Sequence, residues 1–297
     1  MFDQLLNNLT MAKEVEDVED SYLGILVMGG PGSGKTNLAS TAPKPQLVLD
    51  FDHGLTTYAS NGLVKGRDYY PYTFDKFITE DAKGGKDRKV MRSVENITAI
   101  IQLLAYAADR SGAFAPGGID VEDANGQKYN LDLSDTKTIV LDGFTSMSEY
   151  FLYEIMTSRL GLNYDKDKPG FEGYGQLLRA LGNVCELLIK CKKHYHVVGT
   201  ALIKWEQRPG SNSEGDVIAN PNLDGAFRNQ IGKVLDEFYF LDSRRVGSDN
   251  KYYLYSQPLP TVPNLKSRSQ LPAKLEAPTF TKIFSAFVEA HNKHKRG

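Results

Sequence analysis

A glycine-rich segment near the amino terminus constrains the fold more than any other part of the chain. It fits the pattern G-x-x-x-x-G-K-[ST] and consists of Gly29, Gly30, Pro31, Gly32, Ser33, Gly34, Lys35 and Thr36. The apolar run at residues 22–28 before it is typical of a buried parallel strand. Residues 35–41 after it predict a short helix, which Pro43 and Pro45 end. A strand, a glycine-rich loop and a helix in this order predict a phosphate-binding loop.

The residue types in this loop indicate a nucleotide ligand. Glycines let successive backbone N–H groups turn toward phosphate oxygens, and the start of the helix adds its dipole. Lys35 would place a positive charge on the terminal phosphates, and Thr36 would offer its hydroxyl to Mg²⁺. The expected cofactors are therefore ATP and Mg²⁺.

A second strand supplies a carboxylate for the same ion. The run TIVLD at residues 138–142 has four β-prone residues and ends in Asp142. Parallel sheets place their ligands at the carboxyl ends of their strands, so Asp142 fits a Walker B acid. The predicted metal site is Thr36 with Asp142.

Two more acids end the strand predicted at residues 46–51. Asp50 and Asp52 alternate along the strand and so share one face, with Asp52 just beyond its end. They are either caps of a loop or part of the chemistry at the phosphates.

The order of elements predicts an α/β P-loop NTPase with a mostly parallel sheet flanked by helices. After an acidic arm at residues 1–20, one domain is expected over residues 21–297, with a β-hairpin insertion at about residues 112–135 around Asn125-Gly126. Further strands are expected at residues 195–203, 234–242 and 251–257, and helices at residues 90–108, 146–160, 174–192 and 279–294.

The composition says little about binding partners, but its cysteine content favours a reducing compartment. The formal net charge is −2, so no overall basic field indicates nucleic acid, although local basic loops remain compatible with it. Two cysteines, Cys185 and Cys191, indicate a reducing compartment without a disulfide framework or a zinc site. The polar start of the chain is unlike a signal peptide, and no apolar run approaches the ~20 residues of a membrane span. A cytoplasmic protein with no membrane partner is expected.

A resemblance to a known family enters at LDFDHGL, residues 49–55. This stretch resembles the segment after the second core strand of RecA-type recombinases, where an acid followed by His activates the attacking water. The resemblance implies a RecA-like fold and a catalytic role for Asp52, which is one methylene shorter than the Glu of that pattern.

Weaker likenesses extend over roughly residues 22–290 and are similar to phage-encoded RecA-like P-loop ATPases associated with single-strand annealing and recombination. In that fold a polar residue ending the strand after Walker B senses the γ-phosphate, which implies Thr200 in VVGTA. The late K-x-R motif resembles Lys266-Ser267-Arg268 and implies a finger that reaches a neighbour's nucleotide. The resemblance thus implies a homo-oligomer, ring or filament, in a bacterial host's cytoplasm, with a single-strand-binding protein as a possible partner.

The segment after Thr200 is expected to bind single-stranded DNA. Residues 202–225 form a polar stretch rich in Gly, Asn and Ser, predicted as a loop, and in RecA-like proteins the loop at this place lines the DNA channel. Bases can stack on Trp205 while Lys204 and Arg208 track phosphates; a mobile surface loop with one packed Trp is the alternative.

Three functions remain open from the residues. The first is a RecA-like oligomeric ATPase acting on single-stranded DNA. The second is a small-molecule P-loop kinase, against which the insertion at residues 112–135 contains no arginine for a lid over the phosphates. The third is a nucleotide-gated binding protein without physiological hydrolysis.

Overall fold

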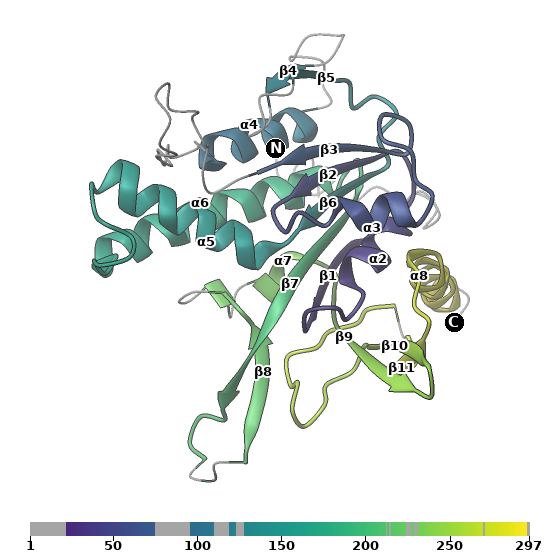
Figure 1. Ribbon diagram of the computed structural model, residues 1–297. Helices are drawn as coiled ribbons and strands as arrows, with labels where there is room; N and C mark the ends of the chain where they lie inside the picture. The colour runs from purple at the N-terminus through teal and green to yellow at the C-terminus, as the bar shows by residue number, and fades with distance from the viewer. Residues whose placement is uncertain are drawn as a thin grey trace, which may run out of the picture.

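The central sheet organises the whole molecule (Figure 1). The computed structural model describes residues 22–74, 96–109, 119–122, 128–211, 213, 215–223, 227–228, 231–269 and 271–295. The strand order is β11-β10-β9-β1-β7-β6-β2-β3, and β8 pairs with β7 beside this path. Neighbours from β9 to β3 pair in parallel, whereas β10, β11 and β8 pair antiparallel.

The strands along the main path are β11 (Lys274–Glu276), β10 (Asp249–Tyr255), β9 (Glu237–Val246), β1 (Gly24–Gly29), β7 (His196–Gln207), β6 (Thr138–Asp142), β2 (Gln46–Asp50) and β3 (Tyr69–Thr73). β1, β2 and β6 are buried along their whole length, as strands covered on both faces must be. The mostly parallel α/β sheet predicted from the sequence is confirmed.

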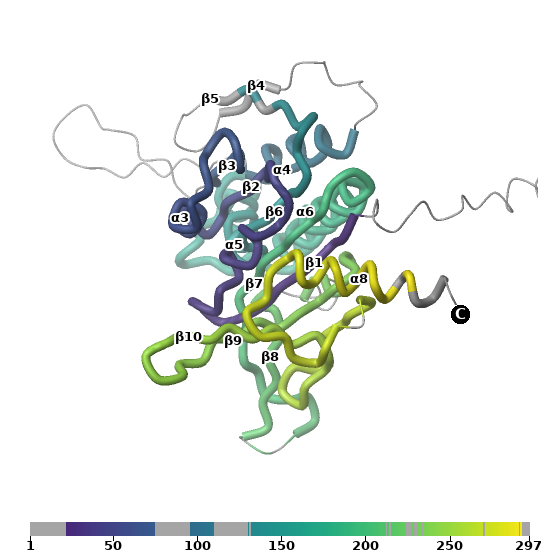
Figure 2. The backbone as a smooth tube through the Cα atoms, turned by 90° about the vertical axis from the view of Figure 1, so that its right-hand side faces the viewer, coloured from purple at the N-terminus to yellow at the C-terminus, as the bar shows by residue number. Residues whose placement is uncertain are grey.

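Helices cover both faces of the sheet, and each face has its own apolar core. One face carries α2 (Lys35–Ser40), α3 (Leu55–Ser60) and α8 (Phe280–Lys295); in Figure 2, α8 is the yellow helix that leads to the carboxyl terminus. The other carries α4 (Asn96–Ala108), α5 (Phe144–Glu154), which continues as a π-helical turn over Ile155–Arg159, and α6 (Gly170–Cys191). Among the described residues, no helix is long and apolar enough to cross a membrane.

The predicted hairpin insertion is present as a separate two-stranded antiparallel sheet of β4 (Ile119–Glu122) and β5 (Lys128–Leu131). Its Asn125-Gly126 turn and the acidic arm at residues 1–20 lie outside the described residues. After β2, the described residues continue with α3 and then β3, which is the last strand of the sheet order on that side.

The prediction of a loop over residues 202–225 is wrong for residues 204–207 and 217–221, which are strand. β7 continues to Gln207, and β8 (Val217–Pro221) pairs with it antiparallel, from Ile203 opposite Pro221 to Gln207 opposite Val217. Cross-strand hydrogen bonds therefore satisfy the backbone of a segment whose Gly, Asn and Ser content suggested a loop. The paired residues 203–207 and 217–221, here called the β7–β8 arm, project from the sheet (Figure 1).

His196 joins three elements at the start of β7. Its Nδ1 accepts a hydrogen bond of 3.0 Å from the Leu23 N–H, and its ring contacts Phe280 and Phe284 of α8 edge-on. Burial lowers the pKa of His196 to about 4. The unfolded chain therefore takes up a proton that the folded protein excludes.

Acid should consequently destabilise the fold between about pH 6.5 and pH 4. The pKa of His196 is lower in the folded protein than in the unfolded chain. The contribution of neutral His196 to the free energy of unfolding is therefore fully present above pH 6.5, and about 3 kcal/mol of it is lost as the pH falls to about 4. His196→Gln keeps an acceptor for Leu23 but cannot titrate, and its free energy of unfolding should lose that component. Urea unfolding at several pH values measures it, with His194→Gln as the control for losing one imidazole; parallel pH curves for His196→Gln and the unsubstituted protein would refute the assignment.

Candidate nucleotide-binding site

The phosphate loop joins the end of β1 to the start of α2. Gly34 precedes the helix with φ of 93°, a left-handed conformation that strongly favours glycine. The Lys35 Nζ donates to the carbonyls of Gly29 (3.0 Å) and Gly30 (2.9 Å), which fixes its ammonium group inside the loop. Burial lowers the pKa of Lys35, while the charges of Asp142 and Asp52 oppose that shift.

Asp142 lies at the carboxyl end of β6. Its carboxylate accepts hydrogen bonds both from the end of the phosphate loop and from the neighbouring strand β7. Thr36 Oγ1 donates to its Oδ2 (2.9 Å) and Thr200 Oγ1 donates to its Oδ1 (2.5 Å). This contact is possible because β7, which carries Thr200, lies between β1 and β6 in the sheet. Burial raises the pKa of Asp142, and the two hydroxyl donors act in the opposite direction.

The donor set at this point fits Mg²⁺. Mg²⁺ prefers hard oxygen ligands and is commonly held by one or two carboxylates together with substrate phosphates and water. Thr36 and Asp142 supply a hydroxyl and a carboxylate 2.9 Å apart beside the loop. Among the described residues no group of three or more His, Cys, Asp or Glu side chains could hold a metal alone. The Thr36 hydroxyl and the Asp142 carboxylate suit a metal that also takes phosphate and water ligands.

Asp52 stands on a tight turn after β2. The Asp52 N–H donates to the Asp142 carbonyl (3.1 Å), and Asp50 Oδ1 accepts from the Gly54 N–H (3.0 Å), so both ends of the turn are held. Burial raises the pKa of Asp50 to about 6. Asp52 itself is exposed and accepts a hydrogen bond from Ser146 Oγ.

Gly143 allows this approach. A Cβ at Gly143 would lie 2.3 Å from Asp52 Oδ2, so a larger residue after the Walker B strand would displace the Asp52 carboxylate from its observed position. Asp50 and Asp52, predicted together from the sequence, therefore have different roles. Asp50 is buried and holds the turn, while Asp52 presents its carboxylate to solvent.

One cavity of about 760 Å³ contains most of the predicted nucleotide-binding residues together with residues that the sequence did not indicate. It is lined by Pro31, Gly32, Gly34, Lys35, Thr36, Asn37, Phe51, Asp52, His53, Thr57, Ser146, Tyr150, Leu202 and Tyr252. Its volume is that of an ordinary small-molecule site. Sequence reasoning missed Ser146, Tyr150 and Tyr252, because no local pattern distinguishes them from other polar or aromatic residues.

Thr200 lies behind this cavity. Its side chain is fully buried and its hydroxyl bonds to Asp142, whereas Leu202, two residues later, lines the cavity. In the described geometry Thr200 orients the Walker B carboxylate. A direct role for Thr200 as sensor of the γ-phosphate stays a prediction.

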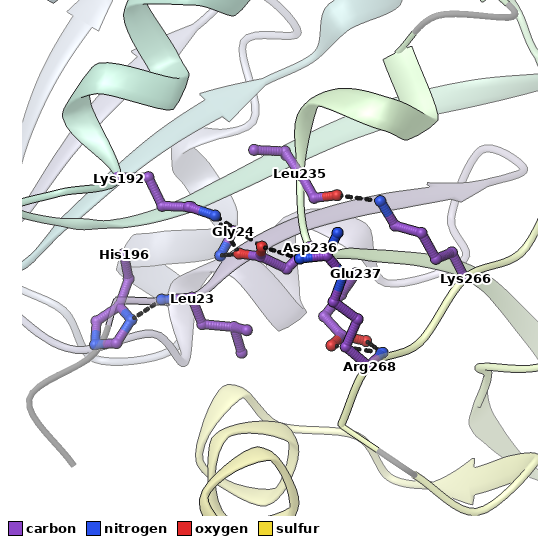
Figure 3. A network of polar contacts seen from close by, with 9 residues as sticks. All are labelled: Leu23, Gly24, Lys192, His196, Leu235, Asp236, Glu237, Lys266 and Arg268. Carbon is purple, nitrogen blue, oxygen red and sulfur yellow. Dashed lines mark hydrogen bonds and ion pairs between the residues drawn. The ribbon is translucent and has the colours of Figure 1, made fainter. Parts of the chain in front are cut away.

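Lys266 and Arg268 lie near the opposite end of β1 from the phosphate loop (Figure 3). Lys266 forms an isolated bridge with Phe238, and its Nζ donates to the Leu235 carbonyl (2.6 Å). The Arg268 backbone N–H donates to Glu237, and its guanidinium, 65% exposed, is 3.4 Å from Asp236. Neither cation can serve its own chain's loop from this position.

The three residues predicted to bind nucleic acid lie on the β7–β8 arm or at its end. Trp205 is half exposed and faces Ala219 across the arm. Lys204 is 3.6 Å from Glu206, and Arg208 forms an ion pair of 2.8 Å with Asp216. The arm thus presents an aromatic ring whose basic neighbours already have acidic partners.

Comparisons with known proteins identify the family of this chain. A comparison with curated proteins gives no match. A KaiC-like protein from the hyperthermophilic archaeon Pyrococcus horikoshii is similar at 12% identity and a TM-score of 0.36, over 78% of this chain and 77% of that one. A family model described as an AAA domain matches residues 21–269. The chain therefore belongs to the AAA domain family and is a nucleotide-binding ATPase of the P-loop class.

Proposed function

We propose that this protein is a RecA-like, oligomeric ATPase that hydrolyses Mg-ATP and acts on single-stranded DNA in phage recombination or annealing. One observation carries the hydrolysis proposal: the exposed Asp52 carboxylate lines the same cavity as Lys35 and Thr36. ATP turnover, measured with and without single-stranded DNA, tests it directly. Absence of phosphate release would favour the nucleotide-gated binding protein, and transfer to an acceptor would favour a kinase.

Each residue has a distinct task in this scheme. Lys35 and the loop N–H groups would hold the terminal phosphates, and Thr36 with Asp142 would hold Mg²⁺, which when bound would neutralise charge on the phosphates. Asp52 takes a proton from the attacking water while Ser146 orients its carboxylate. Positioning and charge stabilisation, rather than covalent chemistry, are what phosphoryl transfer requires.

Oligomerisation would complete the site. Lys266 and Arg268 lie near the end of β1 that is opposite the loop, and the Arg268 side chain is largely exposed. Head-to-tail packing of identical subunits would bring this end of one copy toward the loop of the next, as heterologous contacts do in rings and filaments. A cation acting between subunits needs that placement.

The β7–β8 arm is the proposed DNA contact. It continues β7 beyond Thr200 and Leu202, so one strand connects the Walker B contact, the cavity wall and the half-exposed Trp205. At ~3.3 Å per residue, Trp205 lies about 17 Å along the strand from Thr200. Nucleotide binding at the cavity could thus alter the arm through a single rigid element. The same proposal includes a single-strand-binding protein as a partner.

Because Trp205 is the only tryptophan in the chain, its emission reports on this arm. Adding a single-stranded oligonucleotide should quench emission above 320 nm, and the change should saturate and weaken steeply with salt as counterions are released. Bound ATP should strengthen it. Trp205→Ala should lose 1–3 kcal/mol of strand affinity by fluorescence anisotropy of a labelled oligonucleotide, the usual range for one stacked base.

Two controls make this test specific. Trp205→Phe keeps an aromatic face and should retain most of the affinity, and duplex DNA, whose bases are already stacked, should quench less. If strands bind while Trp205 emission stays flat, the arm is not the contact. If no strand binds in any assay, the DNA part of the proposal fails although ATP turnover can still stand.

A further inference from the structure

We propose that Tyr252, on the hairpin that follows β9, is the stacking platform for the nucleotide's base. This inference rests on the proposed ATP site and assigns a base contact within it. The Tyr252 ring lies directly against the phosphate loop: a Cβ added at Gly34 would be 2.9 Å from Tyr252 Cδ1 and 3.0 Å from Cε1. The same ring lines the 760 Å³ cavity with Lys35 and Thr36.

The arrangement of the cavity gives the nucleotide a direction. Asp52 and Asp142 approach the loop from the β2 and β6 side, where the terminal phosphate and its metal must lie. Tyr252 approaches from the opposite side, because β10 follows β9 and β9 is the other neighbour of β1. A nucleotide with its γ-phosphate near Asp52 therefore extends past Gly34 toward Tyr252.

The Tyr252 ring is carried by a strand, β10, rather than by a loop. Tyr252 pairs with Ser243 of β9, and its carbonyl accepts a hydrogen bond of 2.9 Å from the Ala277 N–H. Side chains alternate along a strand, so Tyr252 shares its face with Leu254, which is fully buried in the core beneath α2 and α8. The backbone that carries the ring is thus ordered before a ligand arrives, which lowers the ordering cost of binding.

Stacking of this kind recognises the face of a base and not its hydrogen-bonding edge. Every base has a π-face, so an aromatic platform favours nucleotides over bare polyphosphate without choosing strongly among bases. Tyr252 should therefore contribute to the affinity for both ATP and GTP. It should contribute nothing to the affinity for inorganic triphosphate, because that ligand has no base.

Equilibrium binding of three probes separates these contributions. Isothermal titration with Mg²⁺ and a non-hydrolysable ATP analogue, the matching GTP analogue and inorganic triphosphate should be run on Tyr252→Ala and Tyr252→Phe. Tyr252→Ala should bind both nucleotides roughly 10-fold more weakly and triphosphate unchanged, whereas Tyr252→Phe should bind all three normally. Tyr253→Ala is the matched control, because it removes the neighbouring ring of the same strand, which contacts Lys274 on the other face.

The outcomes distinguish this inference from the proposed function. If the unsubstituted protein binds neither nucleotide nor triphosphate, the ATP site itself is refuted. If it binds them and Tyr252→Ala weakens all three probes equally, or none, Tyr252 is not a base platform although the ATP site stands. A loss of nucleotide affinity of the same size in Tyr253→Ala would mean that the hairpin acts only through its stability, and this too overturns the inference.

Discussion

Asp52→Asn is expected to bind Mg-ATP nearly normally and to hydrolyse it at least ~100-fold more slowly, the usual scale for losing a positioned base. Asparagine keeps the shape of the side chain and can still accept the hydrogen bond from Ser146. It cannot accept a proton from water at neutral pH. Phosphate release under saturating ATP, together with a separate measurement of ATP affinity, isolates the chemical step from binding.

Lys35→Ala is expected to impair ATP binding, whereas Asp52→Asn impairs hydrolysis. It removes the ammonium group that the Gly29 and Gly30 carbonyls hold in the loop, so tight ATP binding should be lost along with turnover. Normal turnover in Asp52→Asn would place the base elsewhere and leave Asp52 a loop cap. Unchanged ATP affinity in Lys35→Ala would overturn the phosphate-loop assignment itself.

A mixture of two inactive variants, Lys35→Ala and Arg268→Ala, is expected to recover ATPase activity. The first has a defective loop but an intact finger, and the second has the reverse, so a subunit of each kind can form a complete site between them. With random mixing in equal amounts, about a quarter of head-to-tail interfaces would be complete. A cation acting in trans can be worth 10³ or more in rate, so this recovery should stand well above either variant alone.

Arg268→Ala suits this experiment because its effect on folding should be small. Its guanidinium is 65% exposed and 3.4 Å from Asp236, while the Glu237 contact is made by the backbone and survives the substitution. Arg67→Ala is the matched control, since Arg67 is also about two-thirds exposed and has one ion pair, with Asp68. Turnover that does not depend on protein concentration, with no recovery on mixing, would reduce Arg268 to a surface ion pair.

Much of the site followed from the sequence because its signals are local. The phosphate loop is defined by eight consecutive residues, and TIVLD matches β6 residue for residue. Alternation with a period of two and a terminal acid are properties of a single strand, so they needed no knowledge of its neighbours. The ends of strands could not be read from the sequence where polar residues occur inside a strand, as in the β7–β8 arm.

The sequence by itself thus determined that this chain is a P-loop α/β protein with a carboxylate beside its phosphates. Only the tertiary structure decided that Thr200 lies behind Asp142, that Ser146 holds Asp52, and that Tyr252 covers Gly34. The physical reason is sheet order: β7 inserts between β1 and β6, and β9 with β10 lies on the other side of β1. These contacts join residues that are far apart in the sequence, by 58 positions for Thr200 with Asp142 and by 94 for Ser146 with Asp52, and no local periodicity encodes them.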